Sequence, residues 1–305
     1  MLGKRLKEGD TLGIIAPAGF ECKENVIKNI HYLNELGFKT HIGKHVFSKK
    51  GYLAGEDLER ASDFMEMFQN KNVDAILCLR GGYGSLRLLP LIDWSIIKNN
   101  PKIFIGYSDI TCLLNEIQRR CNLICFHGPM LTTKLSENPD TKDSFLETLE
   151  YGSNPYKLQC YNADLSSYSA SITDGYLVGG NLSLICSTLG TPYEIDTSNK
   201  ILFIEDIGEE PYKIDRMLTQ LTLANKLQKC RGFLLGYFSN CGSKNTRDSF
   251  CIKEIIDEKI LSLNKPTLMN FPSGHDYPNV TLPIGAKIRL DCVKNEIRIL
   301  ESVVC

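Results

Sequence analysis

Residues 102–117 read KIFIGYSDITCLLNEI, and this stretch decides the fold of the first half of the chain. An apolar segment at 102–105 is followed by Gly-Tyr-Ser-Asp and then by apolar residues at helical spacing. Those apolar residues are Ile110, Leu113, Leu114 and Ile117. The pattern therefore predicts a buried strand, a tight turn and an amphipathic helix from about 109 to 120.

The same alternation of strand and helix continues on both sides of this stretch. Strands are predicted at 12–16, 40–42, 73–79 and 123–126, and helices at 24–36, 56–69 and 85–91. Such alternation is typical of a mainly parallel sheet with helices on both faces. Ligand sites in these sheets gather beyond the carboxyl ends of the strands. The polar residues that follow each strand are therefore the candidates for a functional site.

The chain divides into two predicted domains. Its 305 residues exceed the size at which a single core usually stops growing. We expect an α/β domain at 1–150, a polar linker rich in Ser, Asn and Tyr at 151–172, and a second domain at 173–305. The second domain is expected to contain strands at 201–204 and 232–237, a helix from 211, and two closing strands within 286–304.

Composition excludes several classes of partner. The net charge is −1, so a nucleic-acid or acidic-membrane partner has no general electrostatic support. No apolar run reaches the roughly 18–20 residues that span a bilayer. The N-terminal apolar run resembles a strand rather than a signal peptide, so we expect a cytoplasmic protein. The twelve cysteines are scattered without a C-x-x-C pair, so no metal site is expected.

Ser108 lies where the predicted strand meets the predicted helix. A serine there presents its hydroxyl at the tip of a turn, and the N–H groups that open the helix can stabilise an oxyanion. This is the chemistry of a nucleophile elbow, although the G-x-S-x-G signature is absent. The alternative is structural, because serine is also a favoured N-cap residue. A capping box is not formed, since Thr111 stands where Glu or Gln would be needed.

Two carboxylates follow the predicted strand at 201–204. Glu205 and Asp206 come directly after this apolar run. A carboxylate at the exit of a buried strand needs a partner, and a histidine would both satisfy it and be oriented by it. The local sequence does not choose between the two carboxylates.

Two histidines are candidates for a general base. His275 lies in the turn-rich segment FPSGHDYPNVTLPIG, and His127 follows a predicted strand in FHGPM. The other three histidines belong to the N-terminal helix and strand region, at positions 31, 41 and 45. His127 therefore remains a competitor of His275 when the residues are considered alone.

A glycine-rich turn follows the predicted strand at 73–79, in CLRGGYGSLRLLPL. The spacing lacks a G-x-G-x-x-G with an acidic residue about 20 positions further on, so the signal for a dinucleotide is weak. Glycine also lets a backbone approach a substrate closely. The turn could therefore supply an oxyanion donor instead of a phosphate cradle.

Taken together, these motifs resemble one family. The matching stretches include GDTLGIIAPAG, GYLAGEDLERASDF, LRGGYGSLRLLPLIDW, IGYSDIT, FHGPM, LVGGNLSLICSTLGTPYEID, LFIEDIGEEPYKIDRMLTQL and FPSGHDYPNVTLPIGA. They extend in order over nearly the whole chain, and the chain resembles the LD-carboxypeptidases. These are serine peptidases, and the group includes the microcin-C-type immunity peptidases.

The resemblance implies a site and a fold. It places the nucleophile at Ser108, the carboxylate at Glu205 rather than Asp206, and the base at His275. It implies an N-terminal domain with a parallel sheet of the flavodoxin or Rossmann kind, and a smaller β-containing C-terminal domain. A homodimer and no cofactor are also implied.

The implied reaction is hydrolysis of the L-to-D peptide bond that releases the terminal D-alanine of cytoplasmic murein tetrapeptides. We expect the backbone N–H groups of Asp109 and Gly82 to bind the oxyanion. Arg80 and Gly81 are expected to bind substrate, because a guanidinium pairs well with a terminal carboxylate. A purely structural role is the alternative for Arg80.

Two other functions compete with this one. An immunity peptidase that cleaves an aminoacyl-nucleotide would use the same three residues. A non-catalytic nucleotide-binding α/β protein would use the glycine turns and would leave Ser108 unreactive. The GYLAG and RGGYG stretches resemble the murein-recycling branch more than the immunity branch.

Overall fold

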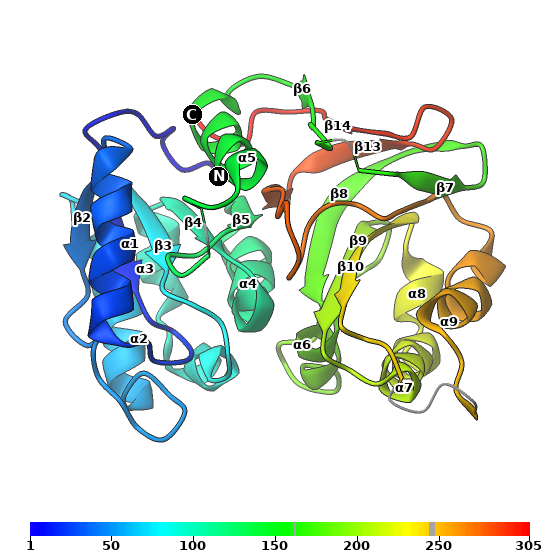
Figure 1. Ribbon diagram of the computed structural model, residues 1–305, viewed down its shortest axis with the longest axis horizontal. Helices are drawn as coiled ribbons and strands as arrows, with labels where there is room; N and C mark the ends of the chain where they lie inside the picture. Colours follow the sequence, from blue (N-terminus) through cyan, green and yellow to red (C-terminus); the bar gives the residue numbers. More distant parts are fainter. Residues whose placement is uncertain (134, 162, 244–247) are drawn as a thin grey trace. The chain divides into compact units, whose positions relative to one another are not determined.

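The computed structural model describes residues 1–133, 135–161, 163–243 and 248–305. The chain forms two units, each with its own sheet (Figure 1). Unit 1 contains Met1–Asn154, Thr281–Gly285 and Ser302–Cys305, and the smaller unit 2 contains Pro155–Val280 and Ala286–Glu301. Two short C-terminal segments therefore return to unit 1.

The sheet of unit 1 has the order β12-β5-β4-β3-β1-β2. Its strands are β1 (Thr11–Ile15), β2 (Lys39–Ile42), β3 (Ala75–Cys78), β4 (Ile103–Gly106), β5 (Cys125–His127) and β12 (Leu282–Ile284). The first five are parallel, and only β12 is antiparallel to its neighbour β5. The predicted parallel α/β sheet is confirmed.

The helices of unit 1 are α1 (Lys23–Glu35), α2 (Asp57–Gln69), α3 (Trp94–Asn99), α4 (Thr111–Cys121) and α5 (Pro139–Tyr151), with 3-10 turns η1 (Ser85–Leu91) and η2 (Ser108–Ile110). Helices lie at three of the predicted segments, 24–36, 56–69 and 109–120, whereas the predicted helix at 85–91 is a 3-10 turn and α3 and α5 were not predicted. Helix α2 begins with a capping box between Glu56 and Glu59. Helix α4 ends at Asn122, whose φ of 50° stops the helix in the left-handed region.

Unit 2 is built on a mixed sheet with the order β6-β14-β13-β8-β9-β10-β11-β7. Its strands are β6 (Tyr156–Lys157), β7 (Ser166–Tyr168), β8 (Ile172–Asn181), β9 (Ile201–Ile207), β10 (Gly232–Ser239), β11 (Thr267–Met269), β13 (Lys287–Asp291) and β14 (Glu296–Ile299). Strands β8 to β11 are parallel, and the outer strands pair antiparallel. The segment predicted as a linker, 151–172, thus contains two short strands of this sheet.

Four helices pack on one face of the unit 2 sheet: α6 (Leu182–Ser187), α7 (Pro211–Leu223), α8 (Lys226–Lys229) and α9 (Ile252–Lys259), followed by the 3-10 turn η4 (Leu261–Leu263) (Figure 1). Their apolar side chains form one core with β9 and β10, including Leu202, Ile204, Leu218 and Phe233. The last polar residues of β9 therefore lie at the edge of this buried apolar core.

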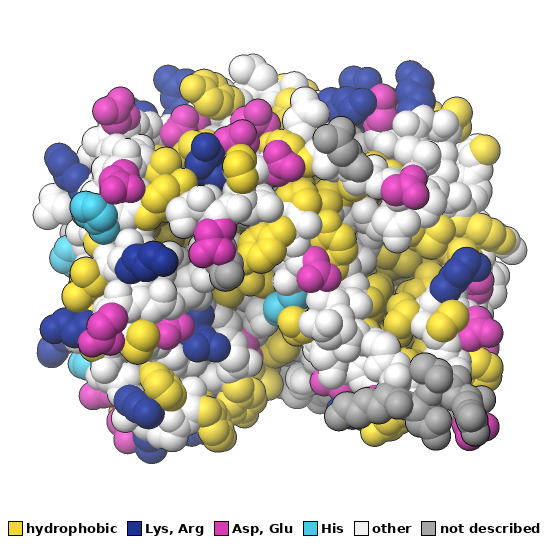
Figure 2. Space-filling view, in the orientation of Figure 1, with side chains coloured by type: hydrophobic (Ala, Val, Ile, Leu, Met, Phe, Trp, Pro, Cys, Tyr) yellow, Lys and Arg dark blue, Asp and Glu magenta, His cyan; other side chains and the backbone are white. Residues whose placement is uncertain are grey.

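Charged side chains of both signs are interspersed on the face that Figure 2 shows, as the net charge of −1 suggests. None of the helices in the described part of the chain combines the length and apolarity that a bilayer crossing requires.

Candidate active site

Ser108 occupies a strained turn at the carboxyl end of β4. It is the first residue of η2, and its φ of 61° lies in the left-handed region, where a non-glycine residue is uncommon. The N-cap residues of η2 and α4 are Tyr107 and Ile110, and Ser108 is itself the first residue of η2. The capping alternative for Ser108 is therefore wrong. Strain of this kind clusters at functional turns.

Gly81 packs directly against Ser108. A Cβ on Gly81 would lie 2.9 Å from both Cβ and Oγ of Ser108, so only glycine fits there. The same Cβ position is 3.6 Å from the backbone nitrogen of Asp109. The glycine turn after β3 and the serine turn after β4 are thus in contact, as neighbouring parallel strands allow.

Gly82 and Gly84 give this turn its shape. Their φ values are 120° and 134°, which L side chains rarely adopt. A Cβ on Gly82 would meet Gly19 at 3.6 Å, so the loop after β1 also lies against the turn. The oxyanion role of the Gly82 and Asp109 N–H groups stays a prediction that this proximity favours.

Arg80 lies beside the same turn. Its guanidinium donates to the backbone oxygen of Phe20 and to Oε2 of Glu21, both at 3.4 Å, and its side chain is 42% exposed. The long distances and the exposure leave the guanidinium able to exchange Glu21 for another carboxylate. Recognition of a substrate carboxylate by Arg80 remains a prediction.

Glu205 and His275 form a hydrogen-bonded pair in unit 2. Glu205 ends the apolar run of β9 and is fully buried, and its Oε2 lies 2.7 Å from Nδ1 of His275. Burial raises the pKa of Glu205, while the hydrogen bond and the charge of His275 lower it. Because Nδ1 is bonded to Glu205, Nε2 is the ring nitrogen that would exchange a proton with a nucleophile in a catalytic triad.

Asp206 has a different environment from its neighbour. It accepts hydrogen bonds from the backbone N–H and the hydroxyl of Ser183, at 2.9 and 2.8 Å, and from Asn181 at 3.1 Å. Burial raises its pKa, and the bond from Ser183 lowers it. Asp206 thus anchors the start of α6, whereas Glu205 holds the histidine.

Two glycines and an asparagine position the Glu205–His275 pair, and the sequence analysis did not identify them. Cβ atoms on Gly274 and Gly236 would approach Glu205 to 2.9 and 3.2 Å. The side-chain oxygen of Asn279 accepts from the N–H of Gly274 at 3.1 Å and so shapes the loop before His275. Glycine within an apolar strand, as at Gly236, is the signal that could have indicated close packing.

His127, the other candidate base, is fully buried in β5. Its ring meets the ring of Tyr107 edge-on, with centroids 5.8 Å apart. It pairs in the sheet with Gly106, two residues before Ser108. Full burial favours a packing role behind the serine turn over proton exchange with a substrate.

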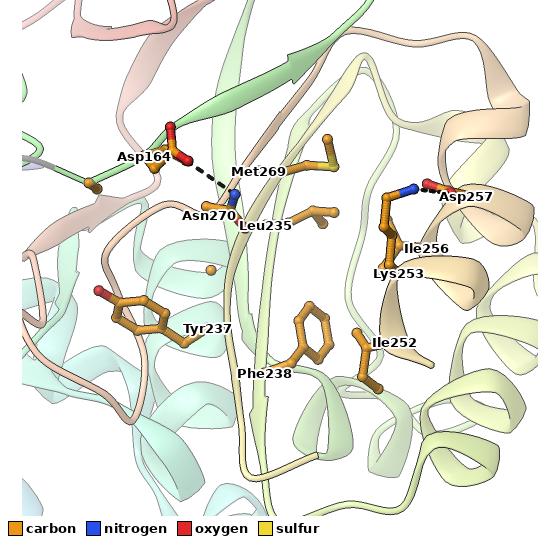
Figure 3. A pocket seen from close by; sticks show the side chains of 12 residues that line it. Asp164, Leu235, Tyr237, Phe238, Ile252, Lys253, Ile256, Asp257, Met269 and Asn270 are labelled. Atoms are coloured by element: carbon orange, nitrogen blue, oxygen red, sulfur yellow. Dashed lines mark hydrogen bonds and ion pairs between the residues drawn. The ribbon is translucent and has the colours of Figure 1, made fainter. Parts of the chain in front are cut away.

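Unit 2 also contains a cavity of about 470 Å³ (Figure 3). It opens where β11 ends at Met269 while β10 continues to Ser239. Apolar side chains from β10, β11 and α9 line it, with Lys253 and Asp257 paired at 2.8 Å on one side. Gly236 borders both this cavity and Glu205.

The fold and the family matches define the chain as a peptidase with one mainly parallel and one mixed sheet. Residues 12–128 match the LD-carboxypeptidase N-terminal domain, and residues 174–290 match the LD-carboxypeptidase C-terminal domain. The chain therefore belongs to the LD-carboxypeptidase family of serine peptidases.

Three relatives illustrate the range of the family. A Bacillus subtilis protein named probable murein peptide carboxypeptidase is 43% identical over 94% of this chain and 91% of its own. The Escherichia coli Microcin C7 self-immunity protein MccF is 31% identical over 99% of this chain and 96% of its own.

A solved wild-type MccF structure without ligand has a TM-score of 0.89 at 28% identity, with complete coverage of both chains. The muramoyltetrapeptide carboxypeptidase of Oxalobacter formigenes has a TM-score of 0.83 at 28% identity, with coverage of 95% and 97%.

Proposed function

We propose that this protein is a serine carboxypeptidase that releases the terminal D-alanine of murein tetrapeptides through Ser108, His275 and Glu205. The observation that carries the proposal is the 2.7 Å bond between buried Glu205 and Nδ1 of His275. A buried carboxylate that orients a histidine is one part of a catalytic triad. His45 and Asp63 form a similar pair at 2.8 Å, but Glu205 and His275 lie within the segment that matches the family's C-terminal domain. The strained turn at Ser108 supplies a matching nucleophile.

In this mechanism His275 takes the proton of the Ser108 hydroxyl through Nε2, and Ser108 Oγ attacks the carbonyl carbon of the L-centre residue. Glu205 stabilises the imidazolium that forms. The oxyanion is bound by the N–H groups of Asp109 and Gly82, each worth about 3–4 kcal/mol in the transition state. His275 then gives its proton to the departing D-alanine nitrogen, and a water molecule hydrolyses the acyl-enzyme.

The names of the relatives support the substrate class. Proteins named as murein peptide and muramoyltetrapeptide carboxypeptidases match almost the whole chain. Arg80 beside the glycine turn is suited to hold the free carboxylate of the terminal residue. A cytoplasmic role in recycling of peptidoglycan follows from this substrate, with the third residue being diaminopimelate or lysine.

Variants of the two reacting side chains test the proposal. Ser108→Ala and His275→Ala should each reduce D-alanine release from a defined tetrapeptide by at least about 10³-fold. Circular dichroism should show that both variants keep the fold. His31→Ala, at a solvent-exposed pair with Glu35, serves as the matched control and should retain full activity. Wild-type turnover in either test variant would refute the assignment.

A second substrate class shares the same three residues. A structure of MccF holds glutamyl sulfamoyl guanosine, so an aminoacyl-nucleotide is the alternative substrate. Parallel assays of amino-acid release from an aminoacyl sulfamoyl nucleotide and of D-alanine release from tetrapeptide separate the two functions. A nucleotide-binding protein without catalysis would show neither product and no labelling of Ser108 by a fluorophosphonate.

We also propose a homodimer in the cytoplasm. Light scattering on the purified protein should give about twice the chain mass of 34.3 kDa. A monomeric mass at micromolar concentration would contradict the dimer but not the proposed catalytic mechanism.

A further inference from the structure

A buried carboxylate follows the candidate nucleophile directly. Asp109 is 1% exposed, and its Oδ2 accepts a hydrogen bond from the backbone N–H of Ser85 at 2.8 Å. The hydroxyl of Ser85, itself fully buried, donates in return to the backbone oxygen of Asp109. This reciprocal pair joins the end of the glycine turn to the serine turn at two points.

Arg60 holds the glycine turn from the other side. It is 2% exposed, and its guanidinium donates to the backbone oxygen of Gly84 at 2.9 Å and to that of Pro17. Its guanidinium also pairs with the carboxylate of Asp57. Gly84 at the end of the turn is therefore hydrogen-bonded to Arg60 of α2, and the next residue, Ser85, is hydrogen-bonded to Asp109 of η2.

The two joined turns are the ones whose spacing matters for catalysis. An oxyanion donor must lie about 2.7–3.1 Å from the developing charge. A misplacement of about 1 Å costs on the order of 10²-fold in rate. Gly82 and Gly84 adopt positive φ readily, but Ser108 does not, so the serine turn does not reach its conformation by intrinsic preference. The hydrogen bonds between Ser85 and Asp109 hold it against the glycine turn.

We infer that Asp109 and Ser85 are positioning residues, which set the distance between the Gly82 N–H and the Ser108 turn and so complete the oxyanion site. The inference rests on the proposed function and adds two residues that act through their neighbours without touching the substrate. A carboxylate is suited to this task because it accepts a hydrogen bond from a backbone N–H strongly.

Four variants test the inference. Asp109→Ala removes the acceptor, and kcat for D-alanine release should fall about 10²-fold or more with KM within about threefold. Asp109→Asn keeps one oxygen that can accept from Ser85, so most of kcat should return. Ser85→Ala removes the hydroxyl that donates to the Asp109 backbone oxygen and contacts Sγ of Cys112, and it should give an intermediate loss of kcat. Asp93→Ala is the matched control, because Asp93 also accepts a backbone N–H, from Ser95 at 2.9 Å, at the start of α3.

The control separates positioning from stability. Asp93→Ala should lower Tm and leave kcat unchanged. If Asp109→Ala retains kcat within threefold of wild type, the inference is overturned. It is also overturned if the Asn variant loses as much kcat as the Ala variant while remaining folded. If Asp109→Ala does not fold, Ser85→Ala decides instead, and kcat within threefold of wild type in that variant overturns the inference.

Labelling of Ser108 by a fluorophosphonate provides a readout that needs no peptide. Its rate should fall with kcat in the Asp109→Ala protein, since the phosphonyl oxygen uses the same donors. A wild-type protein that is labelled but releases no D-alanine would contradict the proposed substrate alone. Equal labelling rates in wild type and Asp109→Ala would contradict the positioning role alone.

Discussion

At the scale of single residues, Ser108 combines a reactive side chain with an unfavourable backbone. At this φ of 61° an alanine side chain would raise the free energy of the folded state by about 1 kcal/mol or more, whereas a glycine meets no steric penalty. Ser108→Gly should therefore be more stable than Ser108→Ala by about 1 kcal/mol, although both are inactive. Urea denaturation of the two variants measures the difference. Equal or reversed stabilities would show that the turn is not strained in solution.

The adjacent carboxylates of β9 should separate activity from stability. Glu205→Gln keeps the volume but removes the charge that orients His275, so kcat should fall about 10²–10⁴-fold with little change in Tm. Asp206→Asn weakens the bonds to Ser183 and should cost about 1–3 kcal/mol of unfolding free energy while kcat changes little. Steady-state kinetics and thermal melts on both variants check the contrast. If Glu205→Gln lost stability and Asp206→Asn lost kcat, then Asp206 and not Glu205 would be the residue that acts in catalysis.

At the scale of elements, a buried lysine closes helix α2. Lys102 precedes β4 and is 8% exposed, and its Nζ donates to the backbone oxygen of Met67 at 3.0 Å and to that of Asn70. Burial lowers the pKa of Lys102 to about 8, from an ordinary value of 10.5. Between these two values the unfolded chain binds more protons than the folded one, so this lysine makes stability rise with pH across that window.

Replacement of the lysine should remove this rise. Lys102→Met keeps an apolar stem but no titrating group, so its unfolding free energy should increase less between pH 8 and pH 10 than that of wild type. The difference in slope is at most about 1.4 kcal/mol per pH unit. Lys98→Met, at an exposed position on α3, is the control and should follow wild type. Parallel pH profiles for wild type and Lys102→Met would contradict the burial of the charge.

At the scale of the whole molecule, the last residues of the chain complete unit 1. Val303 and Val304 are fully buried. The N–H of Arg5 donates to the backbone oxygen of Cys305 at 2.8 Å, and the N–H of Val303 donates to the backbone oxygen of Gly152. Removal of residues 302–305 should lower the unfolding free energy by about 3–6 kcal/mol from the two valines alone. Denaturant titration measures the loss. Cys305→Ser, which changes only an exposed thiol, should behave as wild type.

Most of the unit 1 sheet could be predicted, because the strands are short apolar runs and the helices that follow show a clear apolar periodicity. Strand β12 could not, since 282–284 pairs with β5 from more than 150 positions away and contains a proline. The strands within 151–172 were missed for a related reason. Their residues are polar, and only the neighbouring strands of the unit 2 sheet give them partners.

The sequence by itself determined the α/β pattern, the family and the three residues at strand ends and loops that could react. Local sequence left Glu205 and Asp206 open and the family resemblance implied Glu205; the tertiary structure shows that Glu205 meets His275, because successive side chains of a strand point to opposite faces and each face has a different neighbour. The tertiary structure alone revealed the contact between the two turns, made by Gly81, Ser85 and Asp109. Hydrogen bonds between residues so distant in the chain leave no periodic signal in the sequence.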